Sequence, residues 1–241
     1  MGEYAGRAID QMKHSFSQLP TSFDGQAVLL FSGGRDSSIV AASFCHAFPA
    51  GQLHLLLFDN GLLSRLDATK RQANLLKSLF PNTDIVFETK RVSQMMRTVG
   101  MQQIEKDFTE RGYSSLLICL ACKLIMNVSA TRYANELGIK VVMDGFANRQ
   151  QNYPEQTEEF MSVIREIYRE CGLQYISPLY EFLSDKPTVN KTLGELGVYI
   201  EKQEPVCMWA DSFSTAQREE IVRYTNKTMD LIRQFDVTLH P

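Results

Sequence analysis

The chain lacks any long apolar run. No stretch of its 241 residues approaches the roughly 20 apolar residues that cross a bilayer as a helix. The N-terminal sequence MGEYAGRAIDQMKHSF has no apolar segment of the kind found in secretory signals, and Gly6 stands where a myristoylation signal has Ser or Thr. These absences predict a cytoplasmic protein with no membrane partner.

The chain also lacks an excess of charge of either sign. It has 25 Lys and Arg residues against 28 Asp and Glu residues, which gives a formal net charge of −3. This balance provides no general attraction to nucleic acid, so a partner such as tRNA would need a local basic patch. Solvated helix surface is the simpler interpretation of the six basic residues that could form one: Lys70, Arg71, Lys77, Lys90, Arg91 and Arg97.

Cysteine is scarce, and the four histidines show no paired spacing. The five cysteines are an odd number, which fits thiols, metal ligands or sulfur carriers better than structural disulfides. The chain has a single C-x-x-C, formed by Cys119 and Cys122. A structural zinc site needs four ligands, and without a second C-x-x-C or an H-x-x-x-H we do not expect zinc.

The sequence does contain a regular alternation of short apolar runs and helical patterns. The runs are apolar throughout, as expected of strands that are covered on both faces. Repetition of strand, helix and strand requires crossovers between parallel strands, so we predict an α/β fold with a doubly wound parallel sheet. The predicted strands are Ala27 to Phe31, Leu53 to Phe58, Ile85 to Phe87, Lys140 to Met143 and Leu173 to Ile176, and the helices are Ser37 to Ala47, Ser64 to Phe80, Lys123 to Leu137 and Glu155 to Cys171.

Both ends of the chain are predicted to be helical. We predict one domain over residues 1–241, with a nucleotide-binding core over about 26–196 and a helical extension over about 197–241. The flanking helices either close this domain or form the face of a homodimer. The patterns that indicate them are Ile9, Met12, Phe16 and Leu19 at the N-terminus and Thr215 to Phe235 at the C-terminus.

A phosphate-binding loop is predicted in VLLFSGGRDSSIV, which spans Val28 to Val40. Because Gly33 and Gly34 lack a Cβ, the chain can turn tightly there and let an anion approach its amides, while the following helix offers free N–H groups. Asp36 can hold a Mg²⁺ ion that neutralises the phosphates. Further hydroxyl donors are Ser32, Ser37 and Ser38.

The segment SGGRDS resembles the SGGxDS signature of the PP-loop ATP pyrophosphatase superfamily. Members of this superfamily cleave ATP between its α and β phosphates and attach AMP to an oxygen of the acceptor. The resemblance implies the adenine nucleotide alpha hydrolase-like fold, with ATP and Mg²⁺ as cofactors. It also implies site residues: Ser32, Gly33, Gly34, Asp36 and Ser37 at the pyrophosphate and its Mg²⁺, Phe58 and Asp59 near the adenosine, Gly145 beside the AMP, and Lys186 reaching the phosphates.

Three further segments resemble two sulfur-inserting branches of the superfamily, the nickel-pincer cofactor sulfurtransferases and the tRNA 2-thiolation enzymes. They are CLACK from Cys119, SPLYEFLSDKPTV from Ser177 and EPVCMWAD from Glu204. In branch members with three cysteines these hold a [4Fe-4S] cluster, which would here be bound by Cys119, Cys122 and Cys207. Without a cluster, the same residues would act as a persulfide carrier and its resolving partner, and incidental packing remains a third interpretation.

These resemblances predict an ATP-dependent, AMP-forming sulfurtransferase that adenylates an oxygen and inserts sulfur from a separate donor. Its acceptor would be a nucleobase, a tRNA base or another small heterocycle. The alternative is a nitrogen-delivering enzyme, because YPEQTEEF from Tyr153 is similar to a segment of 7-cyano-7-deazaguanine synthases, although their C-terminal four-cysteine zinc site is absent here. Asn148, Arg149 and Gln150 replace an acidic pair that relatives often carry, which puts a second metal contact in doubt. A non-catalytic module that senses adenine nucleotides is a third hypothesis.

Overall fold

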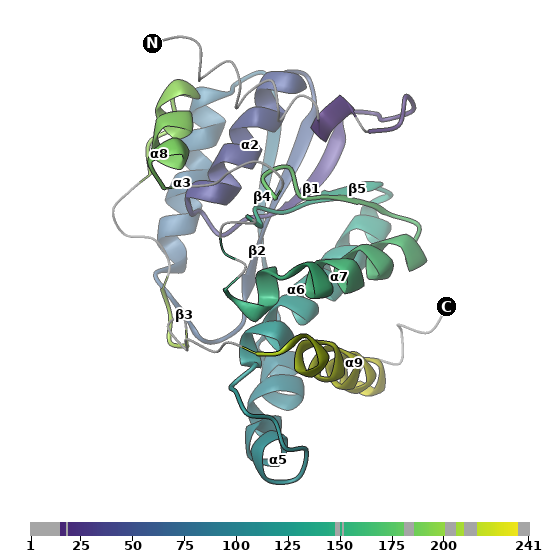
Figure 1. Ribbon diagram of the computed structural model, residues 1–241. Coiled ribbons are helices and arrows are strands. Elements are labelled where there is room, and N and C mark those ends of the chain that lie inside the picture. Colours follow the sequence, from purple (N-terminus) through teal and green to yellow (C-terminus); the bar gives the residue numbers. More distant parts are fainter. Residues whose placement is uncertain are drawn as a thin grey trace.

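A five-stranded parallel sheet forms the centre of the protein in a computed structural model (Figure 1). The structure describes residues 15–17, 19–147, 150, 152–180, 186–200, 206–209 and 216–235. The strand order is β4-β2-β1-β5-β6, and every neighbouring pair is parallel. The strands are β1 (Gln26–Leu30), β2 (Gln52–Asp59), β4 (Asp84–Arg91), β5 (Val141–Met143) and β6 (Gln174–Ile176).

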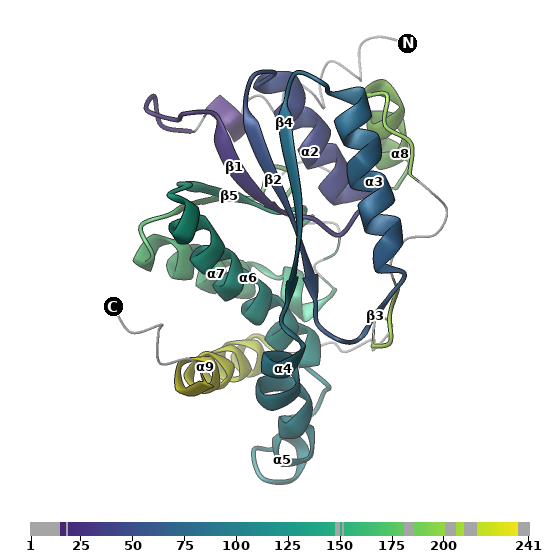
Figure 2. The ribbon, with the colours of Figure 1, turned by 180° about the vertical axis from the view of Figure 1, so that it is seen from behind.

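Helices cover both faces of this sheet (Figures 1 and 2). One face carries α2 (Arg35–Ala47), α3 (Leu66–Leu79) and α8 (Lys186–Glu195), and the opposite face carries α6 (Ile118–Leu137) and α7 (Glu158–Glu170). A last helix, α9 (Arg218–Phe235), packs on the outer side of α6 and α7. The predicted α/β doubly wound sheet is therefore confirmed.

Alternating side chains of each strand enter two separate cores. In β5, Val141 and Met143 pack against α2 and α8, whereas Val142 between them packs against α6 and α7. In β1, Leu29 and Val28 divide between the two faces in the same way. Because successive side chains of a strand point to opposite faces, both sets must be apolar, which explains the unbroken apolar runs in the sequence.

The order of the strands reverses between β1 and β5. From β1 the chain proceeds outward through β2 to β4 on one side, and it then returns to build β5 and β6 on the other side. The loops after β1 and β5 therefore lead from the carboxyl edge to helices on opposite faces of the sheet. In open α/β sheets this switch point is where ligands bind.

The structure corrects two local predictions. The C-x-x-C was placed before a helix that begins at Lys123, but α6 begins at Ile118, so Cys119 and Cys122 lie in its first turns. Ile118 and Leu120 are 1% and 0% exposed, so the helix extends back until its first turn reaches the core. The segment predicted as one helix from Glu155 begins as a short 3₁₀ turn, η4 (Pro154–Gln156), before Thr157 caps α7 by accepting a hydrogen bond from Phe160 N.

Several elements carry no clear sequence signal. Between β4 and α6 the chain forms short helical pieces: α4 (Ser93–Met95), a π-helix η1 (Met96–Gly100), a 3₁₀ turn η2 (Met101–Gln103) and α5 (Ile104–Thr109). A two-residue antiparallel pair joins β3 (Leu63–Ser64) to β7 (Val206–Cys207). This pair brings Cys207 back beside the loop that follows β2.

The predictions of the two terminal helices compare differently with the structure. The C-terminal helix is present as α9, three residues shorter at its start than predicted. The N-terminal pattern at Ile9 and Met12 lies outside the described residues, and Ser15 to Ser17 form a helical turn whose Phe16 packs in the core. No helix among the described residues is long and apolar enough to span a membrane.

A buried charge cluster attaches α9 to α5. Lys227 Nζ in α9 lies 3.0 Å from both carboxylate oxygens of Asp107 in α5, and Arg111 Nη1 lies 2.8 Å from one of them. The side chains of Lys227 and Asp107 are only 14% and 6% exposed. Pairing therefore compensates both charges for the loss of water.

We expect Asp107→Ala to destabilise the protein by about 3 kcal/mol, because it leaves the ammonium of Lys227 buried without its counter-charge. Guanidinium denaturation measures this loss. The matched control is Asp67→Ala, which removes an exposed ion pair with Arg71 and should leave the midpoint unchanged. Equal midpoints for the two variants would contradict the anchoring role of the buried cluster.

Candidate functional site

The segment Ser32–Ser38, here called the phosphate cradle, folds as a tight turn held by its own hydroxyl groups. Ser32 Oγ accepts a hydrogen bond from Gly34 N at 3.2 Å and lies 3.1 Å from Ser37 Oγ. Ser37 Oγ in turn donates to Gly34 O at 3.2 Å. The N-cap residue of α2 is Gly34, which has no side chain with which to cap the helix. The positive end of the α2 dipole is thus directed at the turn, as an anion site requires.

Two glycines allow three chain segments to meet at the cradle. Gly33 has φ +77°, and a Cβ placed on it would lie 2.9 Å from Thr69 Cα in α3. Thr69 also donates its hydroxyl to Ser32 O at 2.8 Å. A Cβ on Gly145, in the loop after β5, would lie 2.8 Å from Ser37 N. Backbone from the loops after β1 and β5 therefore touches at the switch point.

Other predicted nucleotide-binding residues lie around the same edge. Asp36 is half-buried in the first turn of α2, and Ser38 Oγ is buried without a hydrogen-bond partner in the described part of the chain. Asp59 Oδ1 accepts a hydrogen bond from Gly61 N at 2.9 Å. Phe58 is 3% exposed, so its side chain packs in the core. Lys186 is the first residue of α8, and its side chain lies outside what the structure describes.

The cysteines predicted to act together converge from two distant segments. Cys122 Sγ accepts a hydrogen bond from Asn60 Nδ2 at 3.2 Å, and Asn60 Oδ1 accepts one from Leu62 N at 2.8 Å. Burial raises the pKa of the Cys122 thiol, the hydrogen bond from Asn60 opposes this, and the charge of Cys207 raises the pKa further. Cys207 pairs with Leu63 across the short β3–β7 ladder. Asn60 therefore links Cys122 to the residue that precedes β3, and β3 in turn pairs with the strand that contains Cys207.

Cys119 lies one turn before Cys122 in α6. It packs against the core next to α9, where its charge contributes to raising the pKa of Tyr224. Among the described side chains, no group of three or more His, Cys, Asp or Glu residues is arranged to hold a metal ion. The donor types suit iron, but this arrangement of thiols does not form a three-cysteine metal site. The iron–sulfur cluster therefore stays a prediction.

Buried polar groups lock the loop after β5 in place. The carboxylate of Asp144 accepts hydrogen bonds from Ser177 Oγ at 2.6 Å, from Phe146 N at 3.1 Å and from the Tyr175 hydroxyl. Burial raises the pKa of Asp144, while these three donors and the charge of Lys123 lower it. The network fixes the backbone on both sides of Gly145.

Sequence patterns missed three residues of this edge: Asn60, Thr69 and Glu155. Asn60 follows Asp59, a predicted site residue, so it had a nearby signal. Thr69 and Glu155 had none, because only the tertiary fold brings them to the cradle and to α6. Asn148 and Arg149 lie outside the described residues.

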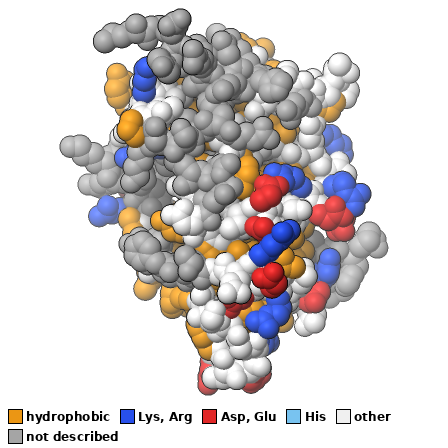
Figure 3. Space-filling model, viewed as in Figure 1, with side chains coloured by type: hydrophobic (Ala, Val, Ile, Leu, Met, Phe, Trp, Pro, Cys, Tyr) orange, Lys and Arg blue, Asp and Glu red, His pale blue; other side chains and the backbone are white. Residues whose placement is uncertain are grey.

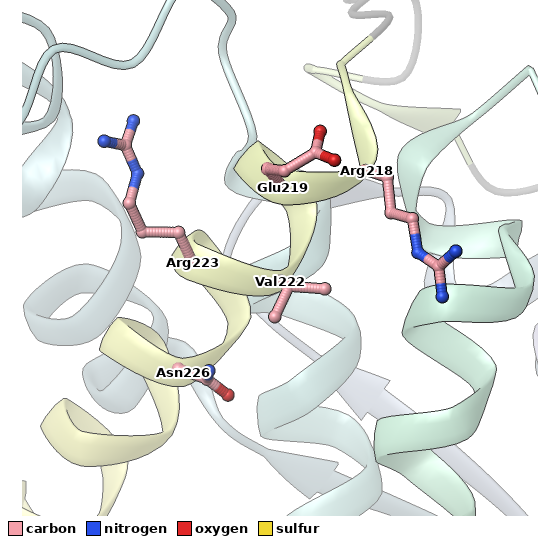
Figure 4. Close-up of a pocket in the computed structure, with 5 residues that line it drawn as sticks. All are labelled: Arg218, Glu219, Val222, Arg223 and Asn226. Atoms are coloured by element: carbon pink, nitrogen blue, oxygen red, sulfur yellow. The ribbon is translucent and has the colours of Figure 1, made fainter.

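Two grooves of the described surface lie away from this edge. One lies on α9 and is lined by Arg218, Val222, Arg223 and their neighbours (Figure 4), and another runs between α7 and α9. Residues of α9 alone line the first groove, and Arg218 and Arg223 point away from each other across it. Neither groove contains a cradle residue or a cysteine.

Two of the six residues considered for a basic patch form ion pairs: Arg71 pairs with Asp67, and Lys90 Nζ lies 3.0 Å from Glu88. Acidic and basic side chains also intermingle over α7 and α9 (Figure 3), where Arg218 pairs with Glu159. These pairs favour solvated helix surface over a basic nucleic-acid face.

The strand order and the cradle together define a PP-loop ATP pyrophosphatase, a class of ATP-dependent adenylating enzymes. A family model described as "Queuosine biosynthesis protein QueC" matches residues 26–212, and the chain belongs to this family. It is the family that the segment from Tyr153 to Phe160 resembles. A sequence comparison with curated proteins finds no match.

Solved structures show the same fold at low sequence identity. A U34-tRNA thiolase NcsA from Methanococcus maripaludis, determined with its [4Fe-4S] cluster, is 12% identical with a TM-score of 0.60, covering 99% of this chain and 80% of that chain. An NMN synthetase from Francisella tularensis is 15% identical with a TM-score of 0.53, covering 99% of this chain and 93% of that one. These likenesses confirm the adenine nucleotide alpha hydrolase-like fold.

We expect Gly145→Ala to weaken binding of a non-cleavable ATP analogue by about tenfold or more, because its Cβ would push the loop away from Ser37. Titration calorimetry measures the affinity, and thermal melting verifies folding. Gly194→Ala in α8 is the control, since a Cβ there meets nothing within 4 Å. Unchanged affinity in a folded Gly145→Ala protein would place the nucleotide elsewhere.

Proposed function

We propose that this protein adenylates an oxygen of a small heterocyclic acceptor with ATP, releases pyrophosphate and then replaces the adenylated oxygen by sulfur. The observation that carries the adenylation step is the phosphate cradle, with Gly145 packed on the first turn of α2. Family membership supports the same chemistry. The acceptor oxygen attacks the α phosphate of ATP, and pyrophosphate leaves.

The chain supplies the groups that the adenylation step needs. The amides and hydroxyls of the cradle would stabilise the negative charge that develops on the departing pyrophosphate. Asp36, at the start of α2, would hold the Mg²⁺ ion, which supplies Lewis-acid stabilisation of the phosphates when it is bound. Transfer of AMP converts a poor leaving oxygen into a good one, so a second nucleophile can displace it.

Cys122 is the proposed sulfur carrier. It lies at the same edge of the sheet, held by Asn60 and near Cys207. In the persulfide route, the terminal sulfur on Cys122 attacks the adenylated carbon, and AMP leaves. The Cys207 thiolate then attacks Cys122 Sγ, which releases the sulfur with the acceptor and leaves a disulfide. A sulfur donor and a thiol reductant must restore both cysteines.

Nitrogen delivery is the second candidate, and the match to the QueC family favours it. A nitrile can arise from an adenylated carboxylate when a nitrogen nucleophile displaces AMP to give an amide, and a second ATP then adenylates the amide oxygen, which leaves as AMP. The precursor of a 7-cyano-7-deazaguanine is then the 7-carboxylate of the same ring. That compound, 7-carboxy-7-deazaguanine, is therefore a suitable probe for both candidates, and a tRNA transcript tests the larger acceptor.

We expect wild-type protein with ATP, Mg²⁺ and 7-carboxy-7-deazaguanine to release pyrophosphate and AMP, and Asp36→Ala to abolish this release. An enzyme-coupled pyrophosphate assay measures the rate. Asp67→Ala, an exposed carboxylate in α3, is the control and should keep the wild-type rate. Binding of ATP without turnover with any acceptor would instead support a nucleotide-sensing module.

The mass of the product separates sulfur from nitrogen delivery. With ammonia and a polysulfide donor both present, because polysulfide carries sulfur at the oxidation level of a persulfide, we expect a sulfur-containing product that Cys122→Ser loses while pyrophosphate release continues. Cys171→Ser, at the end of α7, is the control. A nitrogen-containing product that survives in Cys122→Ser would contradict sulfur transfer. Iron and acid-labile sulfide of about four per chain after anaerobic purification, lost in Cys119→Ala, would replace the persulfide route by a cluster.

A further inference from the structure

Two stripes of residues run along α9. One packs on the domain and is buried: Ile221, Tyr224, Thr225, Thr228 and Ile232. The other, here called the α9 seam, lines surface grooves and repeats at the same spacing of three or four residues: Glu219, Val222, Asn226, Met229 and Arg233. Because residues at this spacing lie on one side of a helix, α9 can contact the domain and a second helix at the same time.

The α9 seam lines two grooves that meet at Asn226. The first has a volume of about 480 Å³ and is lined by the N-terminal half of α9 (Figure 4). The second has a volume of about 490 Å³ and lies between α7 and the C-terminal half of α9. Since Asn226 lines both, the two grooves are continuous along the surface of the helix.

Apolar side chains are distributed unevenly between the two grooves. Val222 is 37% exposed, and the other four residues that line the first groove are polar. The second groove has three apolar side chains, Val163 and Ile167 from α7 and Met229 from α9. Packing Val222 on these three side chains would remove apolar surface from water on both sides. Since Val222 and Met229 are two turns apart on one helix, this contact can form only between two copies of the chain.

The two grooves also carry opposite net charge. The charged residues of the first are two arginines and one glutamate: Arg218, Arg223 and Glu219. Those of the second are three acidic residues and one arginine: Glu166, Glu170, Asp230 and Arg233. Some of these groups already form exposed ion pairs within the chain, such as Arg218 with Glu159 and Glu166 with Arg169. Exposed pairs are weak, so the net charges of the two grooves still complement each other.

An antiparallel arrangement of two α9 helices brings the complementary grooves together. If the two helices cross at Asn226, each residue before it faces the residue equally far after it in the second copy. Glu219 then faces Arg233 of the second copy, because both are seven residues from Asn226, about 10 Å along the helix. Asn226 meets its own counterpart, and an amide can both donate and accept a hydrogen bond there. A parallel arrangement would instead place each of these charges against itself.

We propose that two copies of this chain form a homodimer through α7 and α9. A twofold axis passes at Asn226, and Val222 of each copy packs in the groove between α7 and α9 of the other. A symmetric dimer of this kind uses the same patch twice, as the complementary grooves on one helix require. The α9 helix then both closes the domain and forms the dimer face. No cradle residue or cysteine lines these grooves, so the proposal is independent of the proposed function.

Sedimentation equilibrium of the full chain over a concentration series tests the association. We expect the wild type to approach twice the chain mass of 27.4 kDa as the concentration rises. Val222→Asp should weaken self-association by about tenfold or more, because it buries a carboxylate among apolar side chains. The matched control is Leu79→Asp at the end of α3, where the side chain is 40% exposed and lies on the opposite face of the sheet. This control should associate like the wild type.

An exchange of charge tests the antiparallel arrangement. Glu219→Arg and Arg233→Glu each place like charges opposite one another, twice in the dimer, and should weaken association by about fivefold or more. The double variant restores opposite charges and should regain most of the wild-type affinity. Both side chains are exposed, so circular dichroism should show the wild-type fold in all three variants.

Three results would overturn this dimer. A wild-type chain that stays monomeric at every concentration would leave the grooves to a different partner. Equal effects of Val222→Asp and Leu79→Asp would place the contact on another surface. A double variant that associates no better than Glu219→Arg or Arg233→Glu alone would exclude the antiparallel pairing at Asn226.

Discussion

The contact between Gly145 and the first turn of α2 is the constraint on which the site depends. It joins the loop after β5 to the loop after β1 at the point where the sheet changes direction. Any side chain at position 145 would collide with backbone atoms and separate the two loops. The carboxylate of Asp144 stabilises this arrangement, because it accepts hydrogen bonds from Phe146 N and Ser177 Oγ. The shape of the phosphate cradle is therefore set by the packing of main chain against main chain.

The groups around the cradle depend on the same loop. Gln156 attaches the η4 turn to Ala147, so the position of Glu155 follows that of Gly145. Lys123 rests on Phe146, the residue after Gly145, and it is adjacent to Cys122 in α6. One short segment after β5 thus contacts the phosphate cradle, the η4 turn and Lys123 of α6.

The strands and the cradle were predictable because their signals are local. Parallel strands with two buried faces are apolar throughout, and a glycine pair between a strand and a helix is a short-range pattern. The start of α6 was missed because burial of Ile118 and Leu120, a tertiary effect, extends the helix. Asn60 and Glu155 act through partners that the fold brings to them, 62 residues away along the chain for Asn60 and Cys122. No window of sequence contains such a pair.

The β3–β7 ladder is a small element of the fold. Two residue pairs, with Ser64 Oγ donating to Val206 O and Met208 N to Leu62 O, hold β7 against the segment after β2. Met208 is 82% exposed and Val206 50% exposed, so the ladder buries little of these two apolar side chains. Separating such a ladder costs far less than unfolding the sheet. Opening of β7 would therefore expose Cys207 while the five-stranded sheet stays folded.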